Sequence, residues 1–109
     1  MSEPIALSLR PKDQLVEMVV RVLHPVEPGV AVDLRSGKTV PANFLQTIAI
    51  RLNEKTLLEG QLGSALAKNP QFSFSFVGVR AGDKFLVSCT DSKGRTFERG
   101  IVVPIFKGQ

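Results

Sequence analysis

Apolar and polar side chains alternate along several parts of the chain, most clearly in the run Phe72-Ser73-Phe74-Ser75-Phe76. A period of two sends successive side chains to opposite faces of a β-sheet, so the phenylalanines share one face and the serines the other. Three further stretches alternate in the same way, and their expected inward positions are Val16, Met18, Val20 and Val22, then Ile48, Ile50 and Leu52, then Phe85, Val87 and Cys89. The pattern predicts strands that cover a sandwich core.

Alternation and turn residues together predict seven strands, at residues 5–9, 15–24, 44–52, 56–62, 72–80, 84–91 and 96–105. No window keeps a period of 3.6 residues for more than about two turns, so almost no helix is expected. Seven short strands with polar turns are typical of an all-β, immunoglobulin-like sandwich of antiparallel strands. At 109 residues the chain is expected to form a single domain, 1–109.

Turn chemistry supports these boundaries. Asp91-Ser92-Lys93-Gly94 predicts a type I turn with the glycine in the left-handed region, as in a hairpin closed by a G1 bulge. Ala81-Gly82-Asp83 predicts a second glycine turn. Gly100 is a candidate bulge, which leaves the inward positions of the last strand open.

Some apolar residues fall on predicted outer faces, and neighbouring strands could join them into a subunit interface. They are Val19 and Leu23, Leu45 and Ala49, and Val77 and Val79. The alternative is that loops or the terminal strand cover them.

Composition excludes several classes of partner. The formal net charge is +4, but the basic residues are spread along the chain and there is no Trp or Tyr on which bases could stack, so no nucleic acid is expected. No apolar run approaches the roughly 18 residues of a membrane span, so no membrane partner is expected either.

The segment from Pro25 to Asn43 is longer than most connections in compact domains, which is typical of functional loops. Pro25, Pro28 and Pro41 stiffen it, and Gly29 and Gly37 permit tight reversals. A stiff loop on a rigid sandwich suits partner recognition, although a loop that only bridges the sheets is the simpler interpretation.

Candidate catalytic residues are few. His24 is the only histidine and Cys89 the only cysteine, so a zinc site or a hydrolytic triad lacks its other members. We expect His24 to be structural, with its ring hydrogen-bonded within the proline loop, and Cys89 to be buried and inert. Asp83, Asp91 and Glu98 are expected to be solvated at turns or outer faces. No cofactor, metal or catalytic residue is therefore expected.

Two motifs in and beside the long loop resemble the signature of the SoxZ family. His24-Pro25-Val26-Glu27-Pro28-Gly29 is similar to the family's His-Pro-Met-Glu-Thr-Gly, and residues 37–44, Gly-Lys-Thr-Val-Pro-Ala-Asn-Phe, are similar to its Gly-Lys-x-Ile-Pro-x-Asn-Phe. Asn53-Glu54, Ala67-Lys68-Asn69-Pro70 and Thr90-Asp91-Ser92-Lys93-Gly94 extend the resemblance to nearly the whole chain. Val26 and Pro28 depart from the usual Met and Thr, which bears on partner specificity more than on the fold.

The resemblance implies a non-catalytic subunit of the sulfur carrier used in bacterial thiosulfate oxidation. In that family a SoxY partner carries sulfur intermediates on a C-terminal Cys, whereas this chain ends in Lys107-Gly108-Gln109 without such a Cys. The implied partners are a SoxY-like subunit, in a heterodimer, and other thiosulfate-oxidising enzymes that dock transiently. The implied partner-binding residues are His24, Pro25, Val26, Glu27, Pro28 and Gly29.

The resemblance also bears on location. The first residues, Met1-Ser2-Glu3-Pro4, show no signal-peptide pattern, which alone predicts a cytoplasmic protein. SoxZ proteins, however, are typically exported while bound to a signal-bearing SoxY partner. We therefore expect a periplasmic location.

A rival hypothesis is a self-contained adaptor or chaperone-like sandwich that adds a client peptide to an exposed sheet edge. It predicts a stable monomer with a long unprotected edge. An enzyme, such as a redox domain with one metal ion, would need several histidine ligands, and the chain has one.

Overall fold

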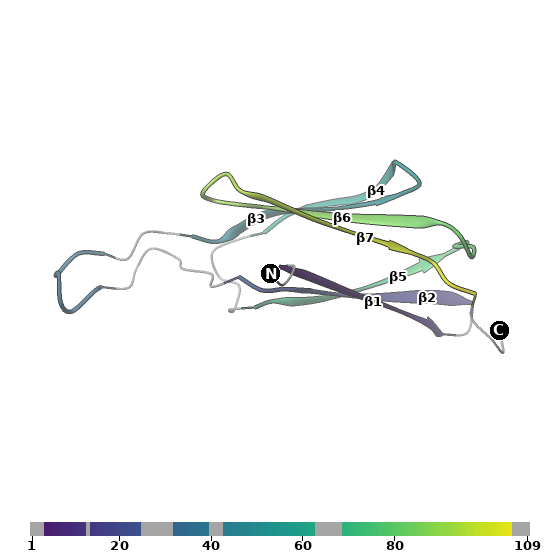
Figure 1. Ribbon diagram of the computed structural model, residues 1–109, viewed down its shortest axis with the longest axis horizontal. Coiled ribbons are helices and arrows are strands. Elements are labelled where there is room, and N and C mark those ends of the chain that lie inside the picture. Colours follow the sequence, from purple (N-terminus) through teal and green to yellow (C-terminus); the bar gives the residue numbers. More distant parts are fainter. Residues whose placement is uncertain (1–3, 13, 25–31, 40–42, 63–68, 106–109) are drawn as a thin grey trace.

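The computed structural model describes residues 4–12, 14–24, 32–39, 43–62 and 69–105 (Figure 1). The described residues form seven strands and no helix. The strands are β1 (Ile5–Lys12), β2 (Leu15–Val22), β3 (Leu45–Leu52), β4 (Lys55–Gln61), β5 (Gln71–Val77), β6 (Lys84–Asp91) and β7 (Thr96–Val102). Among these residues no helix is long and apolar enough to cross a membrane.

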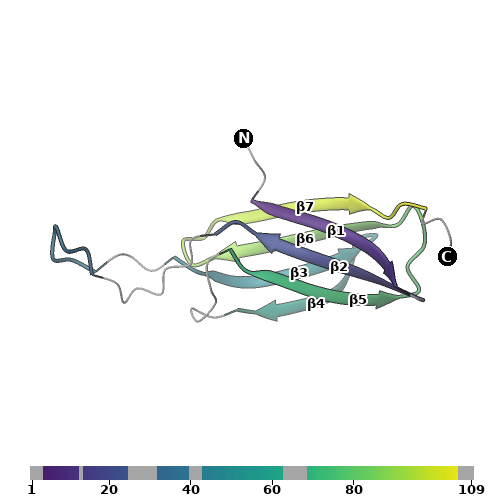
Figure 2. The same cartoon turned by 90° about the horizontal axis from the view of Figure 1, so that it is seen from below.

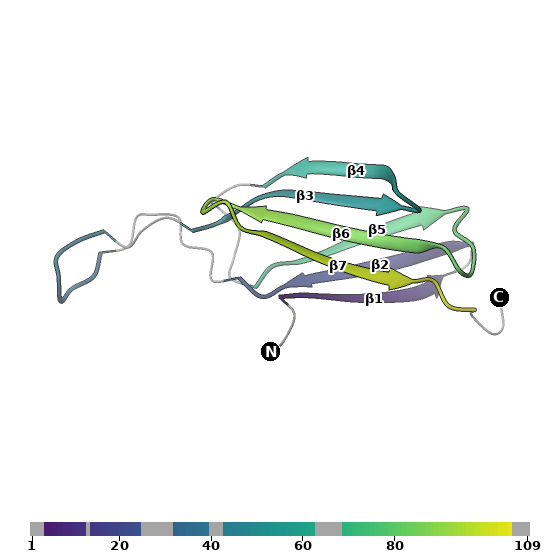
Figure 3. The same ribbon diagram turned by 45° about the horizontal axis from the view of Figure 1, so that its top comes forward.

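The strands make two antiparallel sheets that pack face to face as an immunoglobulin-like sandwich (Figure 1). One sheet has the order β1-β2-β5, seen in front in Figure 2, and the other has the order β4-β3-β6-β7, seen in front in Figure 3. In a constant-type immunoglobulin domain the fourth strand joins the sheet of the first, second and fifth strands. Here β4 pairs with β3 instead. The predicted fold class is confirmed.

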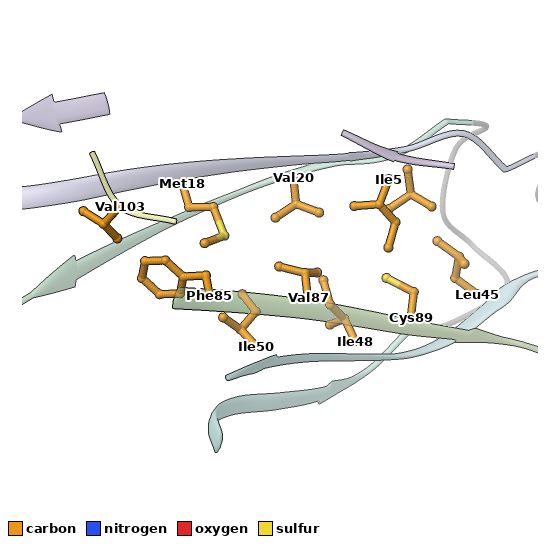
Figure 4. Close-up of a cluster of buried hydrophobic side chains, with 11 residues drawn as sticks. Ile5, Met18, Val20, Leu45, Ile48, Ile50, Phe85, Val87, Cys89 and Val103 are labelled. Atoms are coloured by element: carbon orange, nitrogen blue, oxygen red, sulfur yellow. The ribbon is translucent and has the colours of Figure 1, made fainter. Parts of the chain in front are cut away.

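The core lies between the sheets and consists mostly of residues that the alternation placed inward, joined by Ile5, Leu45 and Val103 (Figure 4). β2 contributes Met18 and Val20, and β6 contributes Phe85, Val87 and Cys89, all nearly or fully buried. The β5 phenylalanines are half-buried and pack against this cluster, with the Phe76 ring 5.1 Å from that of Phe85. Alternation therefore identified the core-facing side of these strands correctly.

The turns follow the predicted chemistry. Gly94 has a φ of 83°, its N–H donates to the Asp91 carbonyl, and the Asp91 N–H donates to the Arg95 carbonyl, as in a type I turn with a G1 bulge. Gly82 has a φ of 91° at the second predicted turn. Asn53 and Glu54, between β3 and β4, both have positive φ, of 49° and 72°, as a type I′ turn requires.

Some predicted strand ends were wrong. β1 runs to Lys12 rather than residue 9. β5 stops at Val77 rather than residue 80, because Gly78 takes a φ of 75° and turns the chain. β2 and β7 end at Val22 and Val102, before the residues 24 and 105 expected from sequence.

Bulges also lie elsewhere than predicted. The β6–β7 register is continuous through Gly100, so the predicted bulge is absent. Register shifts occur instead in β3, between Leu45 and Thr47 against β6, and between Ile50 and Arg51 against β4. The first shift moves Leu45 to the inner face, where it is fully buried, so its predicted outward position was wrong.

The expected apolar patch on the outer faces does not form among the described residues. Leu45 and Val79 belong to the core or pack against it. Leu23 and Val77 are exposed but lie at opposite ends of the β1-β2-β5 sheet, because Val77 is paired with Leu15 at the start of β2. Ala49 lies on the other sheet.

Candidate functional site

The buried polar residues that the structure describes, His24, Asn43 and Asp91, lie at one end of the sandwich, where the long loop leaves β2 and returns to β3. The turn after β6 lies at this end, at the left in Figure 1. Asp91 is the last residue of β6 and continues the inward parity of Phe85, Val87 and Cys89. Its side chain is fully buried, so the sequence-based expectation of a solvated carboxylate was wrong.

Buried Asp91 is satisfied by four donors. Its Oδ1 accepts the backbone N–H groups of Lys93, at 3.0 Å, and Arg95, at 2.9 Å. Its Oδ2 accepts from Arg95 Nε at 2.8 Å and lies 3.4 Å from His24 Nε2. Desolvation raises the pKa of Asp91, but these hydrogen bonds and the charge of Arg95 outweigh it, so the pKa lies below its ordinary value.

His24 follows β2 and continues the inward parity of that strand, with 2% of its surface exposed. Its ring contacts the Asp91 carboxylate and packs in a T-shaped arrangement with the Phe97 ring, with the two centroids 6.4 Å apart. Its backbone is held as well, because its N–H donates to Asn69 Oδ1 at 3.0 Å and its carbonyl accepts from the Asn69 N–H at 2.9 Å. The residue at which the long loop begins is thus fixed on three sides.

The returning end of the loop is fixed to the same turn. Phe44 donates its N–H to Ser92 Oγ at 3.0 Å, and its carbonyl accepts the Ser92 N–H at 2.7 Å. Asn43, beside it, is buried, and its side-chain Oδ1 has no hydrogen-bond partner within the described residues. The turn at residues 91–95 therefore clamps both ends of the loop.

The predicted partner-binding residues are only partly described. His24 is placed at the loop base, whereas Pro25, Val26, Glu27, Pro28 and Gly29 lie outside the described residues. The predicted hydrogen bond between the His24 ring and the proline loop therefore stays a prediction. Sequence reasoning missed Asp91 as the partner of His24, and Arg95 as the partner of Asp91, although Asp91 stands at an inward position of its strand.

Cys89 lies in the core, as expected. It is fully buried between the sheets, and burial raises the pKa of its thiol to about 11 (Figure 4). Because the thiolate is the reactive form of cysteine, this side chain is poorly suited to redox or sulfur-transfer chemistry.

The other carboxylates singled out from sequence have structural partners. Asp83 accepts hydrogen bonds from the Arg80 N–H at 2.8 Å and from Asn53 Nδ2 at 3.0 Å, which lower its pKa. Glu98 accepts from Ser88 Oγ on the outer face of its sheet. Within the described ranges no three His, Cys, Asp or Glu residues lie close enough together to hold a metal ion. What this end of the sandwich can do is hold a loop in place.

Comparison with known families gives one match. The family model described as sulphur oxidation protein SoxZ matches residues 7–101. The match begins within β1 and ends within β7, so it includes both sheets and the clamped loop. No curated protein matches the chain significantly.

Proposed function

Since the chain belongs to the SoxZ family of sulphur oxidation proteins, we propose that it is the non-catalytic subunit of a heterodimeric sulfur carrier. Its partner would be a SoxY-like protein whose C-terminal Cys carries sulfur intermediates derived from thiosulfate. The observation that carries the proposal is the extent of the match, over residues 7–101.

The chemistry of the described residues is consistent with a non-catalytic subunit that supports its partner. His24 and Asp91 contact each other within the protein, and Arg95 holds the carboxylate in its ionised form. A general base must reach a substrate proton, and this pair is buried. The thiol of Cys89 is buried and has a raised pKa. Sulfur transfer would therefore depend on the partner's cysteine.

The clamped loop supports a role in recognition. Its two ends are held by hydrogen bonds to Asn69 and Ser92, so less conformational entropy would be lost when the loop binds a partner. Asn43 adds to this, because its buried side-chain Oδ1 has no hydrogen-bond partner among the described residues, and a donor on the partner protein would pair with it favourably. We therefore place the partner or docking surface at His24–Gly29 and the loop base.

We further propose a periplasmic location, reached by export together with the signal-bearing partner. The proposal rests on family membership, because other members of this family travel in that way.

Native mass spectrometry of the protein isolated from its own source, without reducing agent, tests this function. We expect a 1:1 complex with a protein that ends in a glycine-rich arm bearing a Cys. A monomer with no such partner, isolated from cells that are oxidising thiosulfate, would contradict the proposal and favour a self-contained adaptor.

A further inference from the structure

The middle of the long loop forms a small hairpin that projects beyond the sandwich (Figure 1, residues 32–39 at the far left). Val32 and Thr39 form an antiparallel bridge that closes it. Between them the chain reverses at Gly37, whose φ of 74° favours glycine. The sandwich strands do not cover this hairpin in any of the three views (Figures 1–3).

Hydrogen bonds within the hairpin hold its shape. The Asp33 N–H donates to the Lys38 carbonyl at 2.8 Å, and the Gly37 N–H donates to the Asp33 carbonyl at 2.7 Å. The Asp33 side chain accepts the Arg35 N–H at 2.9 Å, as in an Asx turn. The backbone of the hairpin is therefore organised before any partner arrives.

The organised tip presents an apolar side chain to solvent. Leu34 is 94% exposed and Val32 is 56% exposed. Single exposed aliphatic residues are common, but this leucine stands on a projecting hairpin whose turn is already formed. Burial of this side chain in a partner would be favourable and would order little backbone.

The charges around Leu34 indicate what kind of surface would receive it. Arg35 and Lys38 are exposed and outnumber the one exposed carboxylate of the hairpin, that of Asp33, so the tip carries a net positive charge. A socket rimmed by carboxylates would complement this tip. A second copy of this chain offers a poor socket among its described residues. The hollow of about 600 Å³ over Leu86 is bordered by Arg51 and Lys84 as well as Glu54, and the hollow beside Ile48 has a single carboxylate, that of Glu59.

We propose that the hairpin at residues 32–39 is a docking knob that inserts Leu34 into an apolar, acid-rimmed socket on an enzyme that exchanges sulfur with the carrier. The identity of that enzyme class rests on the proposed function above. The size of the knob favours a transient partner, because one leucine, one valine and two cations bury far less area than the roughly 2,000 Å² or more of a permanent interface. It is a contact separate from the one that joins the two carrier subunits.

Binding measurements on the intact heterodimer test the proposal. Heterodimers that contain wild-type chain, Leu34→Ser, or the double variant Arg35→Glu and Lys38→Glu would be captured on a surface. The thiosulfate-oxidising enzymes purified from the same source would then be passed over them one at a time. Leu57→Ser is the matched control, because Leu57 is 40% exposed on β4, in the sandwich rather than on the hairpin.

For one of the enzymes we expect Leu34→Ser to raise the Kd about tenfold or more, as loss of an apolar anchor does. The charge reversal should slow association most at low salt. Leu57→Ser should bind like wild type. Equal binding of all enzymes to wild type and Leu34→Ser would overturn the proposal. Loss of the heterodimer in Leu34→Ser would overturn it as well, since the knob would then contact the carrier subunit. If the wild-type chain forms no heterodimer, the proposed function fails, and the docking knob fails with it.

Discussion

His24 Nε2 lies 3.4 Å from Asp91 Oδ2, although the two residues are 67 positions apart in the chain. One follows β2 in the first sheet and the other ends β6 in the second, so the contact joins the two sheets at the end where the long loop emerges. Both side chains are almost completely buried. The contact ties the loop base to the rigid part of the sandwich.

Removal of the Asp91 carboxylate should strongly destabilise the protein. In Asp91→Ala the backbone N–H groups of Lys93 and Arg95 and the ring of His24 lose a buried partner, so we expect the free energy of unfolding to fall by about 1–3 kcal/mol. Urea denaturation followed by circular dichroism measures it. Glu98→Ala, on an exposed face, is the control and should change stability by about 0.5 kcal/mol or less. Similar losses in both variants would show that Asp91 has no special role.

The same carboxylate should make the protein sensitive to acid. Its pKa is lowered by folding, so its contribution to stability is present above the ordinary carboxyl pKa of about 3.9 and is lost as pH falls through the folded value. The stability advantage of wild type over Asp91→Asn should therefore shrink between about pH 5 and about pH 2. Urea midpoints of both proteins across this range measure it. An advantage that grows on acidification would contradict the assignment.

Cys89 should resist thiol reagents while the protein is folded. The thiol is fully buried and its pKa is about 11, so at neutral pH almost no thiolate is exposed. Ellman's reagent should react with it only in concentrated guanidinium chloride. Ser73→Cys in a Cys89→Ala background, with the new thiol on an exposed β5 position, should react at once in the native state. Native Cys89 reacting as fast as that control would refute its burial.

The β3–β4 turn should be improved by glycine. Glu54 has a φ of 72°, a left-handed conformation that costs a non-glycine residue about 1 kcal/mol, and a type I′ turn prefers Asn-Gly. Glu54→Gly should therefore raise the free energy of unfolding by about 0.5–1 kcal/mol in urea denaturation. Glu59→Gly, an exposed position within β4, should lower it by a similar amount. A loss of stability in Glu54→Gly would contradict the turn geometry.

The fold was predictable because local pattern and global fold agree. Strict alternation in β2, β5 and β6 identified the inner faces, and glycine in the left-handed region identified the turns at Gly82 and Gly94. Prediction from the alternation fails where a bulge or a turn interrupts the two-residue period of a strand. The bulge after Leu45 reversed the face of that residue, and Gly78 ended β5 three residues before the predicted end.

The site was harder to predict because it depends on contacts between distant segments. The turn containing Asp91 looks like any polar turn, and the residues that satisfy it come from the end of β2 and from its own hairpin. One signal was present: His24, just after β2, and Asp91, at the end of β6, continue rows of inward positions that are otherwise apolar. A charged or titratable residue at such a position needs a partner, and His24 and Asp91 contact each other.

The location of sulfur in the isolated complex tests the central claim most directly. The protein would be isolated from cells oxidising thiosulfate, without reducing agent, and the intact mass of each subunit measured. A 1:1 complex in which the sulfur adducts sit on the partner's C-terminal Cys, with this chain at its unmodified mass, is the result we predict. Sulfur bound to Cys89 of this chain, with no carrier partner present, would contradict the account.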